Sequence, residues 1–435
     1  MTPPTFSPIA VCELDIADAD SFAPLRVADR YERARVLLRW RAHPLALVDA
    51  PVRNGVVDLA PIQAALEPEG TAGPLLIDVL CQEQFEQGPA SYHGEGLDRV
   101  LERSRLTGAV AALEVRFGDP SLTVAVCTRK RPDDLRAALA TAVRTVGVDR
   151  VLVVDNDPGG SARAVAAEFE GVDYVAEFRP GLDFARNRAI AECQTNLLGF
   201  CDDDARLDPY WAVRVRRAFG DDPAAGAVTG LVLAAQLDHE AQELFERTGG
   251  FRRGFEPKRG MAQLTSRGWR SGQMLGIGDY GVGTNMTFRT RVFDEVGLFD
   301  EALDSGTIVG GAGDLDMLYR VAMGGHAIRY TPSAIVWHRH RNTKRGLARQ
   351  LSYNGGVVAF LQGVMERFPL ERPAVRWVAG WVLRHLIWNI VTGPIPRRYA
   401  IAEAYGYVRC LVGRHRARSM AAAQRHGLTT TARTS

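Results

Sequence analysis

A regular alternation of apolar runs and helix-like segments begins at Ser121, and it constrains the fold more than any other feature of the chain. Apolar runs at residues 122–128 and 151–154 each end in polar residues and lead into helical spacing. The same order recurs near residues 174–177 and at 197–200. Because strands that alternate with helices form parallel sheets, the pattern predicts an α/β domain with a parallel sheet.

Three consecutive carboxylates, Asp202, Asp203 and Asp204, follow the apolar run at 197–200. This order places them at the carboxyl end of a buried strand, where open α/β sheets bind ligands. Adjacent carboxylates repel one another, and oxygen ligands at alternate positions suit a hard divalent cation that is shared with phosphate oxygens. An acidic turn or a helix N-terminus is the other interpretation of the triplet.

Two earlier strand ends carry charges of opposite sign. Arg129 and Arg131 follow the first predicted strand, and Asp155 follows the second. Cations can face phosphates, and a carboxylate can accept hydrogen bonds from a base or a ribose, so the pair of strand ends predicts a nucleotide pocket. A solvated loop and a turn former are the alternatives for these residues. The chain contains neither GxGxxG nor GxxxxGK[ST], so the sequence supports neither a dinucleotide fold nor a P-loop.

The remaining chain divides by pattern. Residues 1–118 predict a small α+β module, with strands at 35–40 and 45–52 joined by a turn near His43-Pro44, a second turn at Asn54-Gly55, and helices at 61–66 and 75–85. This module shows no catalytic constellation. The predicted divisions are this module at 1–118, the α/β domain at 119–345, a helical region at 346–425 and a disordered tail at 426–435.

Composition excludes some classes of partner. The chain has 53 basic and 51 acidic residues, a net charge of +2, which argues against general nucleic-acid binding. The positive charge gathers in the carboxyl-terminal third, where Glu403 is the single acid after Glu371. Six cysteines without CxxC spacing predict reduced thiols, and the first ten residues lack the pattern of a signal peptide. We therefore expect a cytoplasmic protein.

Residues 376–390 predict a helix with an aromatic stripe. Trp377, Trp381 and Trp388 fall near one face, interrupted by Arg376, Arg384 and His385. A helix that spans a bilayer needs about 20 apolar residues, so this segment is not predicted to cross a membrane. Packing on its own domain, a homodimer face and peripheral contact with the inner face of a membrane are the three open interpretations.

The order of motifs resembles a known family. The donor half of family 2 glycosyltransferases with the GT-A fold is similar in order and spacing to four segments here: Val126-Cys127-Thr128-Arg129, Val153-Val154-Asp155-Asn156, Gly181 to Asn187, and Asp202-Asp203-Asp204. The family's acceptor-side segment resembles Gly283 to Arg289 followed by Gly297 to Glu301. The first region also looks like the amino-terminal extension of some actinobacterial-type members.

The resemblance implies the GT-A fold, an α/β fold with a mixed, mainly parallel, Rossmann-like sheet flanked by helices. It also implies roles for individual residues. Asp314 stands in the place of the catalytic base, in Gly313-Asp314-Leu315-Asp316, where Gly313 replaces the family's usual acid. The alternative is that Asp314 and Asp316 only cap a helix. The metal site would be Asp202, Asp204 and His338, with His340 as the alternative histidine. Donor-binding residues would be Thr128, Arg129, Arg131, Asp155, Asn156, Asp183, Arg186, Asp202 and Asp203, and acceptor-side residues Asn285, Asp316 and Trp337.

The resemblance also implies a reaction. It is the inverting transfer of a sugar by a hexosyltransferase-class enzyme that uses Mn²⁺ or Mg²⁺ as its cofactor. The donor would be a nucleoside diphosphate sugar, with UDP- and dTDP-sugars as candidates. The acceptor would be a glycan, a lipid-linked molecule, a peptide or a natural product. The alternative function is a non-catalytic relative that binds a nucleotide sugar or a glycan, which Gly313 suggests.

Overall fold

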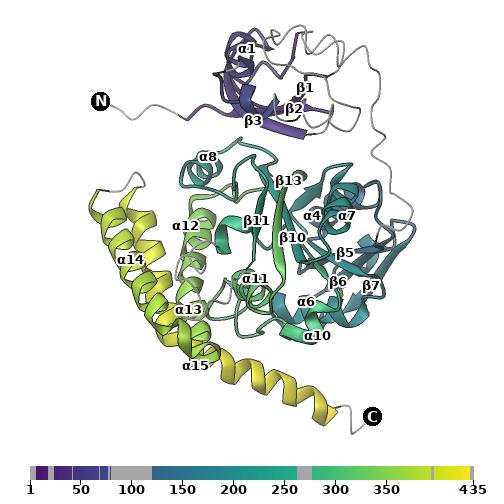
Figure 1. Cartoon of the computed structure of the whole chain (residues 1–435), viewed down its shortest axis with the longest axis vertical. Helices are drawn as coiled ribbons and strands as arrows, with labels where there is room; N and C mark the ends of the chain where they lie inside the picture. The colour runs from purple at the N-terminus through teal and green to yellow at the C-terminus, as the bar shows by residue number, and fades with distance from the viewer. Residues whose placement is uncertain are drawn as a thin grey trace.

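The computed structural model describes residues 6–17, 24–41, 43–67, 69–76, 79, 120–261, 277–392 and 396–431. Figure 1 shows a small amino-terminal module above a larger α/β domain, with the last helices running along one side of that domain. Two sheets organise the described chain. The smaller sheet belongs to the amino-terminal module, and the larger one carries the candidate site.

The large sheet is mixed but mainly parallel. Its nine strands have the order β11-β13-β10-β12-β8-β5-β6-β7, and β9 pairs with β13 outside this path. Strands β7, β6, β5, β8, β10 and β13 run in one direction, whereas β12, β11 and β9 run against them. The predicted fold class is therefore confirmed. The strands are β5 (Leu122–Thr128), β6 (Arg150–Asp155), β7 (Val172–Ala176), β8 (Leu197–Asp202), β9 (Ala205–Leu207), β10 (Ala225–Ala234), β11 (Lys258–Gly260), β12 (Met286–Arg289) and β13 (Ala327–His338).

Helices cover both faces of this sheet, which explains why its central strands are apolar throughout: all seven residues of β5 are buried. Helix α4 begins at Pro132, with two aspartates in its first turn, as the sequence predicted. The helices of the domain are α4 (Pro132–Ala142), α5 (Arg163–Ala166), α6 (Leu182–Glu192), α7 (Trp211–Asp221), α8 (Glu240–Arg247), α10 (Val292–Val296) and α11 (Gly313–Met323), with a 3-10 turn η1 at Ile277–Tyr280.

The register of the central strands brings their carboxyl ends together. Thr128 pairs with Asp155 across β5 and β6, and Cys127 pairs with Asp202 across β5 and β8. The polar residues that follow these strands therefore lie at one edge of the sheet, as the alternating pattern predicted. The third predicted strand is shifted slightly, because β7 begins at Val172 and ends at Ala176.

The described part of the amino-terminal module contains a four-stranded sheet and the helix α1. The first two strands are parallel and the other pairs antiparallel. The turn between β2 and β3 lies before His43, where Arg41 has a positive φ of 44°, and not at the predicted His43-Pro44. Of the helix predicted at 75–85, residues 75, 76 and 79 are helical, and most of the rest lies outside the described residues, as does Cys81. The elements are β1 (Ile9–Asp15), β2 (Arg33–Trp40), β3 (His43–Arg53), β4 (Val56–Val57) and α1 (Ala60–Leu66).

The module packs directly on the large sheet. Leu37 of β2 is fully buried in a cluster with Leu231 of β10 and Ile335 of β13, and Trp337 packs against the same cluster. Arg39 Nη1 lies 2.8 Å from Asp208 Oδ2, and this carboxylate is 1% exposed. The module is thus part of the environment of β10 and β13. The predicted division at residue 118 stays a proposal.

The carboxyl-terminal region is helical, as predicted. Its elements are α12 (Lys344–Ser352), η2 (Tyr353–Gly355), α13 (Gly356–Arg367), η3 (Pro369–Glu371), α14 (Arg372–Val391) and α15 (Arg397–Thr431). Helix α15 continues through Thr431, and the disordered tail predicted from residue 426 stays a prediction. Ala421, Ala422 and Ala423 favour helix strongly, and no proline follows them. Among the described helices, none has the length and apolarity needed to cross a bilayer.

Candidate active site

A cavity of about 610 Å³ opens at the carboxyl ends of β5, β8 and β13, and α6, α11 and α12 complete its walls. Ten of the residues predicted for the site line it: Thr128, Arg129, Arg131, Asn156, Arg186, Asp202, Asp203, Asp204, Asp314 and His338. Five others do not line it: Asp155, Asp183, Asn285, Asp316 and Trp337. The structure therefore brings together most of the predicted site residues, from six separate segments of the chain.

Arg131 holds two of the three consecutive aspartates. Its Nη1 atom lies 2.6 Å from Asp203 Oδ1 and 2.8 Å from Asp204 Oδ2. The hydroxyl of Thr128 donates to the other oxygen of Asp203 at 2.8 Å. Burial raises the pKa of Asp203 to about 7, which Arg131 only partly offsets. Arg131 and Thr128 thus hold Asp203, and Arg131 also holds Asp204.

Asp202 and Asp204 face His338 instead. One ligand atom from each of these three residues lies within 4.8 Å of the others, a spacing that suits a single cation. The Asp204 Oδ1 and His338 Nε2 atoms are 3.1 Å apart, and both side chains are less than 10% exposed. Burial acts to raise the pKa of Asp204, but His338 and Arg131 hold it well below its ordinary value. Two carboxylates and one imidazole form a donor set that fits Mn²⁺, and these are the three residues that the sequence named.

A chain of buried groups fixes the orientation of His338. Its Nδ1 atom lies 3.0 Å from Nδ1 of His340, whose Nε2 atom lies 2.9 Å from Glu246 Oε1 on α8. If His340 donates through Nε2–H to the carboxylate, its Nδ1 accepts a hydrogen bond from the Nδ1–H of His338. The Nε2 lone pair of His338 then faces Asp204. A lone pair facing a carboxylate oxygen is the arrangement that a bound cation stabilises. The two histidines point the same way because alternate residues of an extended segment share a face, as predicted.

Asp314 lies in the same cavity, in the first turn of α11. Its Oδ2 accepts a hydrogen bond from the backbone N–H of Gly283 at 2.8 Å, and its Oδ1 accepts from Leu315 N at 2.8 Å. Burial, and then the charge of Asp304, raise the pKa of Asp314, while Arg186 acts in the opposite direction. A partly buried carboxylate with a raised pKa is a suitable proton acceptor.

Gly313 has a structural explanation. A Cβ atom at this position would lie 2.9 Å from the carboxyl carbon of Asp183, and closer still to its Oδ2. Asp183 is 1% exposed, and among the described residues its Oδ2 has no hydrogen-bond partner. Its Oδ1 accepts from Arg186 Nη1 at 2.9 Å, and the same nitrogen lies 2.6 Å from Asp304 Oδ2. The acid that the family places at position 313 is thus replaced by carboxylates from α6 and from the loop before α11.

The residues that miss the cavity have structural partners. Asp155 is fully buried and accepts from Asp157 N, Ala162 N and the Tyr174 hydroxyl, so it closes the loop after β6. Asn285 donates to Leu231 O and Ala334 O at the register shift between β10 and β13, and accepts from Trp211 Nε1. The contacts leave neither side chain free to reach a ligand in the cavity.

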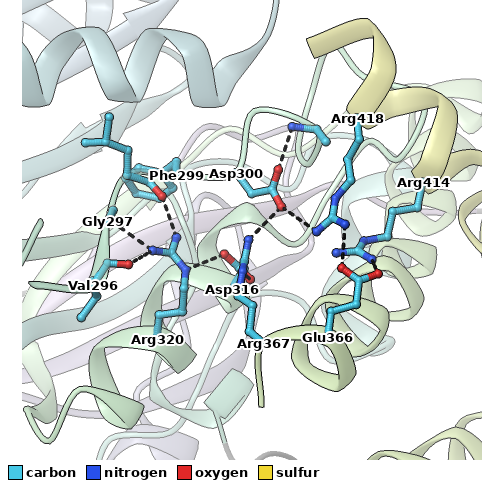
Figure 2. A network of polar contacts seen from close by, with 12 residues as sticks. Val296, Gly297, Phe299, Asp300, Asp316, Arg320, Glu366, Arg367, Arg414 and Arg418 are labelled. Carbon is cyan, nitrogen blue, oxygen red and sulfur yellow. Dashed lines mark hydrogen bonds and ion pairs between the residues drawn. The ribbon is translucent and has the colours of Figure 1, made fainter. Parts of the chain in front are cut away.

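Asp316 and Trp337 also lie elsewhere. Asp316 is 2% exposed and pairs with Arg320 at 2.8 Å and with Arg367 of α13, in the network that Figure 2 shows. Trp337 packs toward the amino-terminal module. The proposed acceptor role of these two residues and Asn285, and the nucleotide role of Asp155, therefore have no support from their positions.

Sequence reasoning also missed part of the cavity wall. Arg253, Arg341, Arg349 and Tyr353 line the side formed by the loop after α8 and by α12 and η2. Arg341 stood in the basic run after β13, but no pattern linked the others to a site. Asp304 and Glu246 were not predicted either, because their roles depend on partners 118 and 94 residues away in the sequence.

Comparison with known proteins finds similarity to glycosyltransferases. Residues 123–268 match the model of glycosyl transferase family 2, so this part of the chain is a domain of that family. The resemblance read from the sequence is confirmed. Two curated relatives from Mycobacterium tuberculosis (strains CDC 1551 / Oshkosh and ATCC 25618 / H37Rv) are both named pre-mycofactocin glycosyltransferase. They are 26% identical over 310 residues, which cover 70% of this chain and 58% of each relative.

Solved structures give weaker similarities. A mannosyltransferase, PcManGT from Pyrobaculum calidifontis in complex with GDP-Man and Mn²⁺, is 16% identical with a TM-score of 0.43, over 72% of this chain and 88% of that one. GalNAc-T7 with UDP, GalNAc and Mn²⁺ is 11% identical with a TM-score of 0.40, over 65% of this chain and 59% of that one.

Proposed function

We propose that this protein is an inverting, metal-dependent glycosyltransferase that moves a sugar from a nucleoside diphosphate to an acceptor nucleophile. One observation carries the proposal. A three-residue donor set for a cation, Asp202, Asp204 and His338, shares a cavity with a partly buried carboxylate, Asp314, whose pKa is raised. The first group suits a leaving diphosphate, and the second suits the proton of an acceptor.

On the donor side of the proposed reaction, positive charge stabilises the leaving diphosphate. When bound by these three residues, a divalent cation supplies positive charge that stabilises the diphosphate as it leaves. Arg129, exposed on the cavity wall, is placed to bind the donor's phosphates, while Arg131 and Thr128 hold the aspartates in position. Arg341 lies on the same wall and lowers the pKa of Asp204, after the larger effects of His338 and Arg131, which marks it as a further cation near the site.

The acceptor half depends on Asp314. The acceptor oxygen attacks the anomeric carbon from the side opposite the diphosphate, and its proton passes to an oxygen of Asp314. The bond between the anomeric carbon and the diphosphate oxygen breaks, and its electron pair leaves with the diphosphate. One displacement inverts the configuration, and no covalent intermediate forms. Arg186, between Asp183 and Asp304, balances the negative charge beside this base.

The non-catalytic alternative loses its main support. Gly313 suggested it, because the family's usual acid is absent there. The close approach of Asp183 accounts for the glycine, and Asp304 supplies negative charge beside Asp314. The position of Gly313 therefore fits a working base.

The substrates are the least defined part of the proposal. UDP- and dTDP-sugars are the donors to test first. The name of the curated relatives makes pre-mycofactocin one acceptor to test, beside glycans, lipid-linked sugars and peptides.

A turnover screen tests the proposal. Nucleoside diphosphate sugars are incubated with the protein and each acceptor, with and without Mn²⁺ or Mg²⁺, and nucleoside diphosphate release is followed. Release that requires both the metal and one donor supports transfer. Binding of a donor without release, across all acceptors, would favour the binding-protein alternative, and the absence of any donor binding would contradict both.

A further inference from the structure

The exposed apolar residues of this protein are concentrated on its last two long helices. Thirteen of the twenty large hydrophobic residues exposed in the described chain belong to α14 and α15. Contiguous apolar surface of this kind marks an interaction site. The residues, named here the outer face, are Trp377, Trp381, Leu383, Ile387, Trp388, Ile390 and Val391 of α14 and Ile401, Tyr405, Val408, Leu411, Val412 and Met420 of α15.

The spacing of these residues follows the helix, so the exposure is systematic. On α15, Ile401, Tyr405, Val408 and Val412 recur at intervals of four, three and four residues, which places them on one side. On α14, Ala374, Val375 and Val378 are buried, and the last two belong to the cluster that contains Phe360 of α13. Figure 1 shows both helices outside α12 and α13, along one edge of the molecule. Each helix thus uses one side for its own domain and exposes another apolar side.

The inner side of α15 is firmly attached. Arg414 and Arg418 pair with the two oxygens of Glu366 on α13, the Arg414 Nη1 and Glu366 Oε1 atoms being 2.5 Å apart, and Arg418 also faces Asp300, as Figure 2 shows. The buried Cys410 contacts the backbone of Val309. Because these contacts fix the rotation of the helix, the outer face does not result from a loosely placed helix.

Charge identifies the partner. Within residues 372–392 and 396–425, Glu403 is the single acid, and it is buried. Exposed arginines stand among the apolar residues of the outer face or beside them: Arg376, Arg384, Arg397, Arg398 and Arg416. The outer face is therefore both apolar and cationic, with no exposed carboxylate in that range.

We propose that the outer face binds the surface of an anionic lipid bilayer. Tryptophan and tyrosine side chains prefer the headgroup level, aliphatic side chains enter the acyl boundary, and arginines attract anionic headgroups. A second copy of the chain fits less well, because a two-fold contact would place arginine against arginine without a carboxylate between them. This inference does not depend on which reaction the protein catalyses.

Docking there would also orient the cavity. A Cβ on Gly355 would lie 2.6 Å from the backbone N of Tyr407, so η2 and α15 meet at their backbones. Tyr353 and Asn354 of η2 line the cavity wall. The outer face is thus rigidly joined to the side of the cavity opposite the central strands.

Vesicle sedimentation tests the proposal. The full chain is mixed with vesicles of phosphatidylcholine alone or with phosphatidylglycerol, at low and high salt. We expect binding to anionic vesicles that is at least about tenfold stronger than to neutral ones and that weakens with salt. Trp377→Ser combined with Trp388→Ser should reduce this binding about tenfold or more, and Arg376→Gln with Arg384→Gln should remove the preference for anionic lipid.

Phe178→Ser is the matched control, because Phe178 is 59% exposed, as Trp377 is, and lies on another part of the surface. It should bind vesicles as the wild type does. Light scattering of the same proteins tests the other possible partner of the outer face, a second copy of the chain. A dimer that the tryptophan variants dissociate, with no vesicle binding, would overturn the proposal in favour of a second copy. A monomer without vesicle binding would overturn it outright.

Discussion

Asp183 occupies the space that any side chain at position 313 would need, since a Cβ there would lie 2.9 Å from its carboxyl carbon. The two residues are 130 positions apart in the sequence, yet the start of α11 is built around this contact. The glycine is therefore required by its neighbour, and the negative charge beside Asp314 comes from Asp304.

Replacing this glycine should damage the site. Gly313→Ala forces Asp183 or α11 to move, so we expect a loss of about 1–3 kcal/mol in the free energy of unfolding, together with reduced transfer. Gly380→Ala is the control, because a Cβ at Gly380, within α14, meets nothing within 4 Å. It should change stability by less than about 1 kcal/mol, and in the stabilising direction. Urea denaturation of both variants makes the comparison, and equal stabilities would contradict the packing argument.

Metal binding should distinguish two adjacent aspartates. Asp204 faces His338, whereas Asp203 is held by Thr128 and Arg131. At about 100 times its dissociation constant, Mn²⁺ should stabilise the wild-type protein by about 2.7 kcal/mol. Asp204→Asn should abolish this effect, and Asp203→Asn should retain most of it. Thermal melts with and without Mn²⁺ measure this stabilisation. If Asp203→Asn lost it and Asp204→Asn kept it, the metal site would have been assigned to the wrong carboxylate.

His340 should position His338 without binding the metal itself. His340→Phe removes the acceptor of the His338 Nδ1 proton but keeps an aromatic ring among Phe245 and Phe251, whose ring centroids lie 4.8 and 5.8 Å from that of His340. We expect Mn²⁺ affinity to fall about 10- to 100-fold, measured by electron paramagnetic resonance of free Mn²⁺. His326→Phe, at a histidine paired with Glu295, is the control for the substitution itself. An unchanged affinity in His340→Phe would exclude the positioning role.

His43 should make stability depend on pH. Burial, and then the charges of Arg214, Arg217 and Arg39, lower its pKa to about 3. In the unfolded chain the histidine pKa is about 6.5, so between about pH 3 and pH 6.5 the unfolded chain binds more protons than the folded one. This histidine therefore destabilises the fold as pH falls below about 6.5. From pH 7 to pH 5 the loss should be about 2 kcal/mol, and His43→Asn should remove it. His415 is exposed, so His415→Asn is the control. If the free energies of unfolding of the wild type and of His43→Asn changed in parallel with pH, this account would be contradicted.

Much of the site could be predicted from the sequence, because it depends on local rules. A polar residue after a buried strand lies at the carboxyl edge of the sheet, which located Thr128, Arg129, Arg131 and the aspartate triplet. Alternation along an extended segment placed His338 and His340 on one side. These features follow from strand geometry and do not require knowledge of distant partners.

The errors arose where tertiary contacts decide what a side chain does. Asn285 serves the irregular pairing of β10 and β13, and Asp155 satisfies three donors in its own loop. Asp316 occupies the acid position of a motif but faces arginines from α11 and α13. A motif gives residue type and spacing, whereas the direction of a side chain depends on which partners the fold brings to it.

The measurement that tests the central claim most directly is the rate of sugar transfer by Asp314→Asn. Asparagine keeps the shape of the side chain but cannot accept the acceptor's proton, so transfer should fall by about 10²- to 10⁴-fold. Donor and Mn²⁺ binding should stay close to the wild-type values, because Asp314 lies outside the group formed by Asp202, Asp204 and His338. A variant that transfers sugar at the wild-type rate would contradict the assignment of Asp314 as the base, and with it the proposed mechanism.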